Sequence, residues 1–251
     1  MNHAVTITGL DVRYGDSIAL TGLDLEVPCG SSLAVIGPNG SGKSTLLNAI
    51  AGVVDAAAGT IDRPGGVPAL VLQSTDVDRS LPITVRDTVG LARYAELGLL
   101  RRFGRADRDA VETAMERLNI SHLANRQLHE LSGGQRQRAL VAQGLAQHAN
   151  LLLLDEPVTG LDITSRGVIL EVIREEVASG RTVIVTTHDL DDARLCDRVL
   201  LVNRHRVAFG APDDVLTEAN LLHAFGGRFI QVGDRLILDD PYHHQHGMHH
   251  D

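Results

Sequence analysis

The chain has 251 residues, of which 43% are hydrophobic and 22% charged, and its formal net charge at pH 7 is -9. This length and composition allow a sizeable core in one large domain, or in a domain with a subdomain. This net negative charge argues against nucleic acid as a partner, because neutralising phosphates requires clustered Lys and Arg.

Nothing in the sequence predicts a segment that crosses a membrane or directs the chain out of the cell. No apolar stretch reaches about 18 residues without a charge. The first ten residues, MNHAVTITGL, lack the basic start and apolar centre of a signal peptide. Cys29 and Cys196 belong to no CxxC or Cys/His cluster, which favours reduced thiols. We therefore expect a cytoplasmic protein that associates with a membrane only through a partner.

The first part of the chain alternates strand patterns with turn residues. β-Rich segments at residues 5–7 and 18–27 are separated by a turn at residues 14–16. An apolar run at residues 33–36 precedes a glycine-rich loop and a helical pattern at residues 43–51. A strand, a glycine loop and a helix in this order predict an α/β unit.

The middle of the chain is predicted to insert helices into this α/β core. Residues 69–72 are one more apolar strand pattern. Residues 74–130 are instead rich in Arg, Ala, Leu and Glu, with helical periodicity at residues 107–118 and no strand pattern. Because the helical pattern resumes at Gly133, we place a helical subdomain at about residues 74–148.

The last part of the chain returns to strands. Apolar strands at residues 151–154 and 182–186 flank a helix at residues 164–178, and this β-α-β order implies a parallel, buried sheet. Residues 199–202 and 206–209 are two further short strands. We divide the chain into a main domain at residues 1–225, a β-hairpin at 226–240 that turns at 233–234, and a histidine-rich tail at 241–251.

The glycine-rich loop fits the pattern G-x-x-x-x-G-K-[ST], in which backbone N–H groups surround nucleotide phosphates. The helix that follows directs its positive dipole end at the same charge. In this pattern Lys43 reaches the β- and γ-phosphates and the Ser44 hydroxyl binds Mg²⁺, so ATP and Mg²⁺ are the expected cofactors. The strand before the loop and the helix after it disfavour a chance glycine-rich turn. The predicted phosphate-binding residues are Gly37, Pro38, Asn39, Gly40, Ser41, Gly42, Lys43, Ser44 and Thr45.

Acidic residues follow the apolar strand at residues 151–154. Because ligands of open α/β sheets bind beyond the carboxyl ends of the strands, we expect Asp155 beside the Mg²⁺ and Glu156 within reach of the attacking water, as a general base. His188 and Gln73 follow two other predicted strands. His188 could contact the γ-phosphate and Gln73 the metal or the water, or either could be an ordinary surface residue.

A second anion site is predicted at the segment LSGGQ, residues 131–135. Ser132 can cap a helix that begins at Gly133 and Gly134, and bare glycine N–H groups at a helix N-terminus attract anions. One nucleotide does not require two phosphate sites from the same domain. We therefore interpret Ser132 through Gln135 as the part that contacts ATP held by a second copy of the chain.

These motifs, in this order, strongly resemble the ATP-binding cassette (ABC) family, whose signature is LSGGQ; the resemblance extends from about residue 4 to residue 225. It implies an α/β fold: a P-loop NTPase core with an N-terminal antiparallel β region and an inserted α-helical subdomain. It further implies that Tyr14 stacks on adenine, Gln73 is the Q-loop residue, Asp162 belongs to the D-loop and His188 is the switch histidine. Members of this family hydrolyse ATP as head-to-tail dimers, with each nucleotide between the phosphate loop of one copy and the signature segment of the other.

Stretches outside the nucleotide motifs are similar to importer ATPases for zinc and manganese. They are residues 77–87, 90–94 and 196–203. In the family, the region after the Q-loop receives a segment of the membrane partner. The resemblance therefore implies integral membrane permease subunits and an extracytoplasmic metal-binding protein as partners, with this chain peripheral on the cytoplasmic face of the membrane.

Other functions are compatible with the same nucleotide motifs. The cargo could be iron complexes or another nutrient, and transport could be export. Soluble ABC ATPases of translation or DNA repair usually have two cassettes or a long coiled-coil insertion, and this sequence has neither. A regulatory module without turnover is disfavoured by the presence of Glu156 and His188.

The C-terminal tail is rich in histidine. Dense imidazoles suit Zn²⁺, Cu²⁺ or Ni²⁺, and suit Mn²⁺ much less well. The tail therefore predicts metal binding and favours zinc over manganese as cargo; a solvated end or the remnant of a purification tag are the alternatives. Five of the twelve histidines lie within eight residues: His243, His244, His246, His249 and His250.

Overall fold

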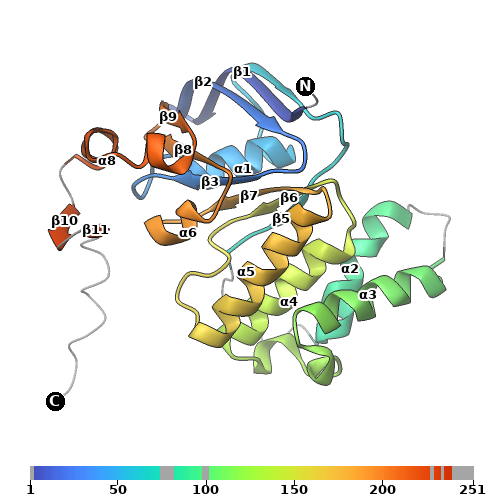
Figure 1. Ribbon diagram of the computed structural model, residues 1–251. Helices are drawn as coiled ribbons and strands as arrows, with labels where there is room; N and C mark the ends of the chain where they lie inside the picture. Colours follow the sequence, from blue (N-terminus) through green and yellow to red (C-terminus); the bar gives the residue numbers. More distant parts are fainter. Residues whose placement is uncertain (1–2, 74–81, 98–101, 227–228, 233–234, 239–251) are drawn as a thin grey trace.

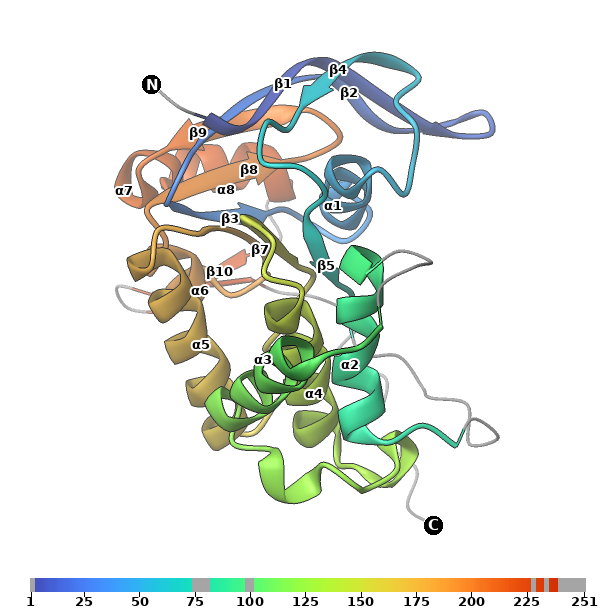
Figure 2. The same ribbon diagram turned by 90° about the vertical axis from the view of Figure 1, so that its right-hand side faces the viewer.

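The computed structural model describes the backbone of residues 3–73, 82–97, 102–226, 229–232 and 235–238. The side chains of residues 95–97, 229–232 and 235–238 are not described. Figure 1 shows the course of the chain, and Figure 2 shows it from a perpendicular direction.

Within the described residues, the main sheet has six strands in the order β5-β6-β7-β3-β8-β9. Adjacent strands are parallel from β5 to β8, and only β9 is antiparallel to its neighbour. Every residue of β3, β6 and β7 is buried, which explains why these strands are continuous apolar runs rather than alternating patterns. The strands are β3 (Ser32–Ile36), β5 (Ala69–Val71), β6 (Leu151–Leu154), β7 (Thr182–Thr186), β8 (Arg198–Val202) and β9 (Arg206–Gly210).

A second, antiparallel sheet covers one side of the main sheet, with strand order β2-β1-β4. It contains β1 (His3–Tyr14), β2 (Ser17–Pro28) and β4 (Ala58–Asp62). Helix α1 (Lys43–Ala51) lies between the two sheets. A buried apolar cluster that includes Leu25, Leu46 and Leu153 joins β2, α1 and β6, so α1 is held from both sides.

Helices cover the opposite side of the main sheet (Figure 2). They are α2 (Val85–Leu97), α3 (Arg105–Arg117), α4 (Gly133–Ala146) and α5 (Ile163–Ala178), with 3₁₀ turns at Ser121–Leu123 and Leu128–Glu130. The inner faces of these helices share one apolar core with the sheet. An ion pair between Arg117 and the buried Glu176, at 2.5 Å, also joins α3 to α5. Helices α2 to α4 lie in the interval proposed for the inserted subdomain, whose boundaries stay a prediction.

The C-terminal part adds short elements, some of which pack against β8 and β9. They are α6 (Leu190–Arg194), α7 (Pro212–Val215), α8 (Glu218–Phe225) and the antiparallel pair β10 (Phe229–Val232) and β11 (Arg235–Leu238). The predicted turn at residues 233–234 and the tail at 241–251 lie outside the described residues. So do residues 77–81, the first part of the stretch at residues 77–87 that is similar to importer ATPases.

The predicted fold class is confirmed, with a few differences in detail. Strand β5 ends at Val71, one residue earlier than expected. Strand β4 was not predicted, because all but one of its residues are exposed and it lacks an apolar alternation. Among the described helices, none is long and apolar enough to cross a bilayer.

Candidate nucleotide site

Two glycines fix the loop between β3 and α1. Gly42 has a φ of 100°, a left-handed conformation that favours glycine, and a Cβ there would lie 2.5 Å from Cδ2 of Leu20. Gly37 approaches the carbonyl oxygen of Val202 so closely that its Cβ would overlap with this oxygen. Any side chain at these two positions would therefore change the course of the loop.

Lys43, the first residue of α1, directs its ammonium group back into the loop. Its side chain is buried, and Nζ donates hydrogen bonds to the carbonyl oxygens of Gly37 at 2.9 Å and Pro38 at 3.3 Å. The N-terminal N–H groups of α1 face the same region. A fixed cation beside a helix N-terminus suits a phosphate chain.

A polar hollow of about 430 Å³ lies over this loop. The described residues that line it are Tyr14, Ser17, Ile18, Ala19, residues 39–45, Gln73, Glu156 and Arg204. The half-exposed ring of Tyr14 supplies an aromatic surface, and the loop supplies N–H groups and Lys43. An aromatic wall and a cationic floor fit a purine nucleotide with its phosphates. Sequence reasoning missed Arg204, because it reaches the hollow from the β8–β9 turn and belongs to no motif.

The ends of β6 and β7 are joined by one hydroxyl group. Thr186 Oγ1 donates a hydrogen bond to Oδ1 of the buried Asp155 at 2.6 Å. The same oxygen accepts a hydrogen bond from the backbone N–H of Glu156 at 2.8 Å. Glu156 also has a positive φ of 46°, which is uncommon for a residue with a side chain. Thr186 therefore holds the Asp155 carboxylate and the backbone of Glu156, although no sequence motif singled it out.

Glu156 and His188 face each other at the end of the sheet. Glu156 Oε2 lies 3.7 Å from His188 Nδ1, which is an electrostatic contact rather than a short hydrogen bond. The His188 imidazole lowers the pKa of the Glu156 carboxyl, although burial opposes this shift. The carboxylate in turn raises the pKa of His188, again against the effect of burial. The pair therefore favours an ionised carboxylate beside an imidazole that is more easily protonated than usual.

The signature segment begins α4, as predicted from the sequence. Ser132 caps the helix: its Oγ accepts a hydrogen bond from the N–H of Gln135 at 3.3 Å, and Gln135 Oε1 accepts one from the N–H of Ser132 at 3.1 Å. Gly134 packs against the start of α5, where an added Cβ would lie 2.5 Å from Oγ of Ser165 and 2.9 Å from Oδ2 of Asp162.

Asp162 caps α5 and lies beside the signature segment rather than at the phosphate loop. Its Oδ1 accepts a hydrogen bond from the N–H of Ser165 at 2.9 Å, and this bond lowers the pKa of the Asp162 carboxyl. Among the described residues that line the hollow, none comes from residues 132–135 or from Asp162. Within one copy, the structure thus brings Tyr14, the phosphate loop, Gln73 and Glu156 together, and it does not bring the signature segment to them.

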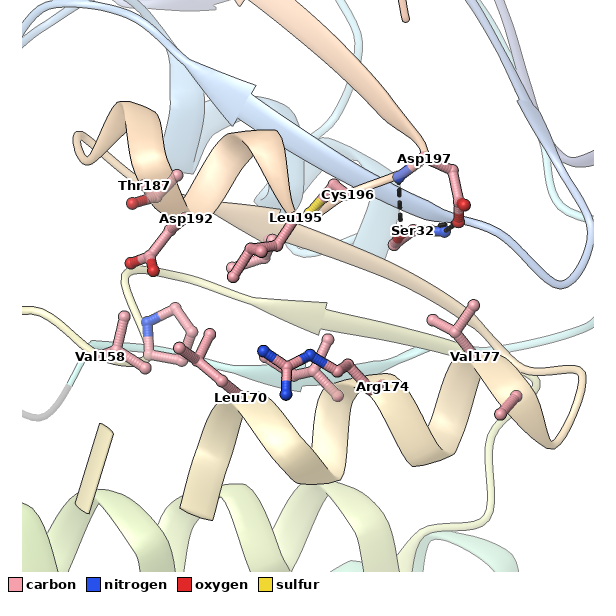
Figure 3. A pocket seen from close by; sticks show the side chains of 14 residues that line it. Ser32, Val158, Leu170, Arg174, Val177, Thr187, Asp192, Leu195, Cys196 and Asp197 are labelled. Carbon is pink, nitrogen blue, oxygen red and sulfur yellow. Dashed lines mark hydrogen bonds between the residues drawn. The ribbon is translucent and has the colours of Figure 1, made fainter. Parts of the chain in front are cut away.

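A second cavity, of about 290 Å³, lies between α5 and the segment from α6 to β8 (Figure 3). Its walls are mostly apolar and include Val158, Leu170 and Cys196. Burial raises the pKa of the Cys196 thiol to about 12, so this thiol is unreactive at neutral pH. This cavity is separate from the nucleotide hollow.

The fold and the phosphate loop define a nucleotide-binding P-loop protein, and comparison with known proteins identifies its family. The family model described as ABC transporter matches residues 20–159. The chain belongs to the ABC transporter family. It is an ATP-binding subunit that hydrolyses ATP to drive transport, as the sequence predicted.

Curated relatives align over most of their length. The manganese transport system ATP-binding protein MntB of Listeria monocytogenes is 36% identical, covering 88% of this chain and 95% of the relative. The zinc transport system ATP-binding protein TroB of Treponema pallidum is 37% identical, over 90% and 88%. The chelated iron transport system membrane protein YfeB of Yersinia pestis is 37% identical, over 94% and 82%.

Solved structures show the same fold. A chain from a structure described as an inward-facing ABC transporter of metal-chelate type matches with a TM-score of 0.82 and 28% identity, covering 94% of this chain and 96% of that chain. The protein cbiO1 of Clostridium perfringens, part of the ABC transporter complex cbiONQ, matches with a TM-score of 0.72 and 27% identity, over 89% and 94%.

Proposed function

We propose that this chain energises the import of a divalent metal ion, with zinc as the first candidate and manganese as the second. The observation that carries the proposal is that relatives aligned over nearly their full length are named for manganese, zinc and chelated iron transport. The histidine-rich tail favours zinc, because imidazole ligands suit Zn²⁺ better than Mn²⁺. The name of MntB favours manganese.

In the proposed hydrolysis, Glu156 orients and deprotonates the attacking water. The carboxylate is ionised at neutral pH, and the His188 imidazole lowers its pKa further. His188, with its raised pKa, would supply positive charge near the γ-phosphate, and Lys43 would neutralise the β- and γ-phosphates. Tyr14 would stack on the adenine ring.

The Mg²⁺ that accompanies ATP would be held by oxygen ligands from Ser44, Gln73 and Asp155. Ser44 and Gln73 line the hollow, and Thr186 holds the Asp155 carboxylate at the adjacent strand end. Hydroxyl, amide and carboxylate oxygens are the donors that Mg²⁺ prefers. Mg²⁺ would neutralise phosphate charge and orient the nucleotide.

Two copies would complete each other's sites in a head-to-tail dimer. The signature segment, residues 132–135, begins a helix of 14 residues, whose positive N-terminal end attracts phosphate. It does not line the hollow of its own copy. A second copy facing this one would bring its segment to that hollow, and the interface would use the same two patches twice. Asp162 would then lie at the same interface, next to Gly134.

The permease would contact the exposed face of α2. A hollow of about 380 Å³ between α2 and α3 has an apolar part that includes Leu91, Tyr94 and Phe103, and a charged margin of Arg86, Asp87 and Arg108. Leu91 and Tyr94 are about half exposed. An exposed apolar patch of this kind suits a protein partner, and it follows Gln73 in the sequence, as the family resemblance implies for the permease contact. An extracytoplasmic metal-binding protein would complete the transport system.

Uptake of radioactive zinc and manganese tests the cargo directly. Cells that lack the chain should lose zinc uptake, and the wild-type gene, but not Lys43→Ala, should restore it. Loss of manganese uptake alone would make manganese the cargo. If neither metal's uptake changes while the purified protein hydrolyses ATP, the metal proposal is wrong and the family assignment stands.

A further inference from the structure

The position of His188 depends on the residues on either side of it. Its side chain is 46% exposed, so burial alone does not fix the imidazole. Before it, the buried Thr187 donates its backbone N–H to the carbonyl oxygen of Val35 at 3.2 Å, which joins the segment to β3. After it, the backbone N–H of Asp189 donates to Thr187 Oγ1 at 3.0 Å. Whatever holds Asp189 therefore also helps to place His188.

The carboxylate of Asp189 connects this segment to two helices. Its Oδ1 accepts hydrogen bonds from the backbone N–H groups of Asp191 at 2.8 Å and Asp192 at 3.3 Å, and so caps α6. Its Oδ2 accepts a hydrogen bond from Arg166 Nη2 of α5 at 3.1 Å. One oxygen of the carboxylate thus begins α6, and the other binds α5.

Arg166 reaches Asp189 from near the start of α5. The same nitrogen, Nη2, also donates to Oδ1 of the buried Asp192 at 2.5 Å. The side chains of Arg166 and Asp189 are each about one third exposed, so solvent screens their attraction only in part. This ion pair joins α5 to the residue that directly follows His188.

We propose that Arg166 is a positioning residue for ATP hydrolysis, which acts through Asp189 to hold His188 opposite Glu156. The inference rests on the role proposed above for His188 near the γ-phosphate. Among the described residues that line the nucleotide hollow, neither Arg166 nor Asp189 occurs. Their effect on hydrolysis would therefore pass through His188 rather than through a contact with the nucleotide.

Asp189→Asn tests this contact more selectively than removal of Arg166. Without Arg166, the buried carboxylate of Asp192 would lose a hydrogen-bond donor, which can destabilise the fold. In Asp189→Asn, the amide oxygen can still accept the N–H groups of α6, since Asn caps helices about as well as Asp does. The amide NH₂ group then replaces the oxygen that accepts from Arg166. This variant breaks the contact with α5 and preserves the ion pair between Arg166 and Asp192.

Steady-state ATPase kinetics of the full chain test the proposal. Asp189→Asn and Arg166→Gln are each measured alone and in combination with His188→Gln. If the two residues act through His188, their effects disappear when the imidazole is already absent, whereas a purely structural effect would persist. Circular dichroism and ATP binding check that each variant is folded.

Two matched controls remove the same charges from the same helices. Asp191→Asn changes an exposed acid of α6, two residues after Asp189. Arg174→Gln changes an exposed arginine of α5, whose guanidinium pairs with Glu171 of the same helix at 2.9 Å. Both should hydrolyse ATP at the wild-type rate.

Asp189→Asn and Arg166→Gln should lower kcat about 10- to 100-fold, because a small misplacement of a group near the reacting atoms can cost about 100-fold. The Kd for ATP should not change, since neither residue lines the hollow. In the His188→Gln background, neither substitution should lower kcat further.

Wild-type kcat in the folded Asp189→Asn variant would overturn the proposal. A further loss of similar size in the His188→Gln background would also overturn it, because Arg166 and Asp189 would then act independently of the histidine. Wild-type kcat in His188→Gln itself is a different failure: the role proposed for His188 would be wrong, and the inference about Arg166 would fall with it.

Discussion

The hydroxyl of Thr186 holds the carboxylate of Asp155 through a hydrogen bond of 2.6 Å between two buried side chains. Because the same oxygen also accepts the Glu156 N–H, one side chain at the end of β7 fixes the two acids at the end of β6. The proposed metal ligand and the proposed general base thus share a single support.

Thr186→Val should lower the ATPase rate while leaving the fold intact. Loss of a hydrogen bond to a charged group is worth about 1.5–3 kcal/mol, or roughly 10- to 100-fold, when the bond positions a reacting group. The Mg²⁺ concentration needed for half-maximal activity should rise, and Thr186→Ser should restore both values. Thr182→Val, at the other end of the same buried strand, is the matched control and should change stability without changing the Mg²⁺ requirement.

Gly134→Ala should destabilise the protein, and Gly133→Ala should not. The Cβ added at Gly134 meets Ser165 Oγ at 2.5 Å, whereas the Cβ added at Gly133 meets nothing within 4 Å. Overpacking of this kind costs about 1–3 kcal/mol. Urea unfolding of the two variants checks the difference, and equal midpoints would show that α4 and α5 are not packed as described.

The ion pair between Glu156 and His188 should raise the free energy of unfolding, and the size of this effect should depend on pH. The His188 contribution is full below its ordinary pKa of 6.5 and is lost as pH rises through the raised value. The Glu156 contribution is present above 4.5 and is lost as pH falls through the lowered value. The stability difference between wild type and His188→Gln should therefore be largest between these limits. Thermal unfolding across pH measures it, and a difference that grows at alkaline pH would contradict the assignment.

The two cysteines should differ strongly in reactivity. At pH 8 a thiol with a pKa of about 12 is ionised in only about one molecule in 10⁴. Cys29 is exposed. Mass spectrometry after brief treatment with iodoacetamide should therefore find label at Cys29 and almost none at Cys196, and addition of urea should expose Cys196. Equal labelling in the native state would mean that the cavity beside α5 is open.

Local sequence patterns predicted the phosphate loop and the strands around it. The remaining residues of the site are placed by long-range contacts. The phosphate loop and its helix follow from one short segment, and every residue of β6 and β7 is buried, as their largely apolar sequences predict. Thr186 and Arg204 reach the site only through the folded sheet. No sequence spacing marks such contacts.

The proposed dimer explains why one chain carries two phosphate-binding segments that do not meet. Glu156→Gln should preserve nucleotide binding and lower turnover by roughly 10²–10⁴-fold, the usual contribution of a general base. ATP bound without being hydrolysed would then hold two copies together. Lys43→Ala, which weakens phosphate binding, should remain monomeric and serves as the control.

The most direct test is therefore the mass of Glu156→Gln in saturating ATP and Mg²⁺, measured by light scattering during gel filtration. We expect a stable dimer that carries two ATP molecules and separates when Mg²⁺ is removed. A monomer that nevertheless carries bound ATP would contradict it, because the signature segment would then have no nucleotide to contact.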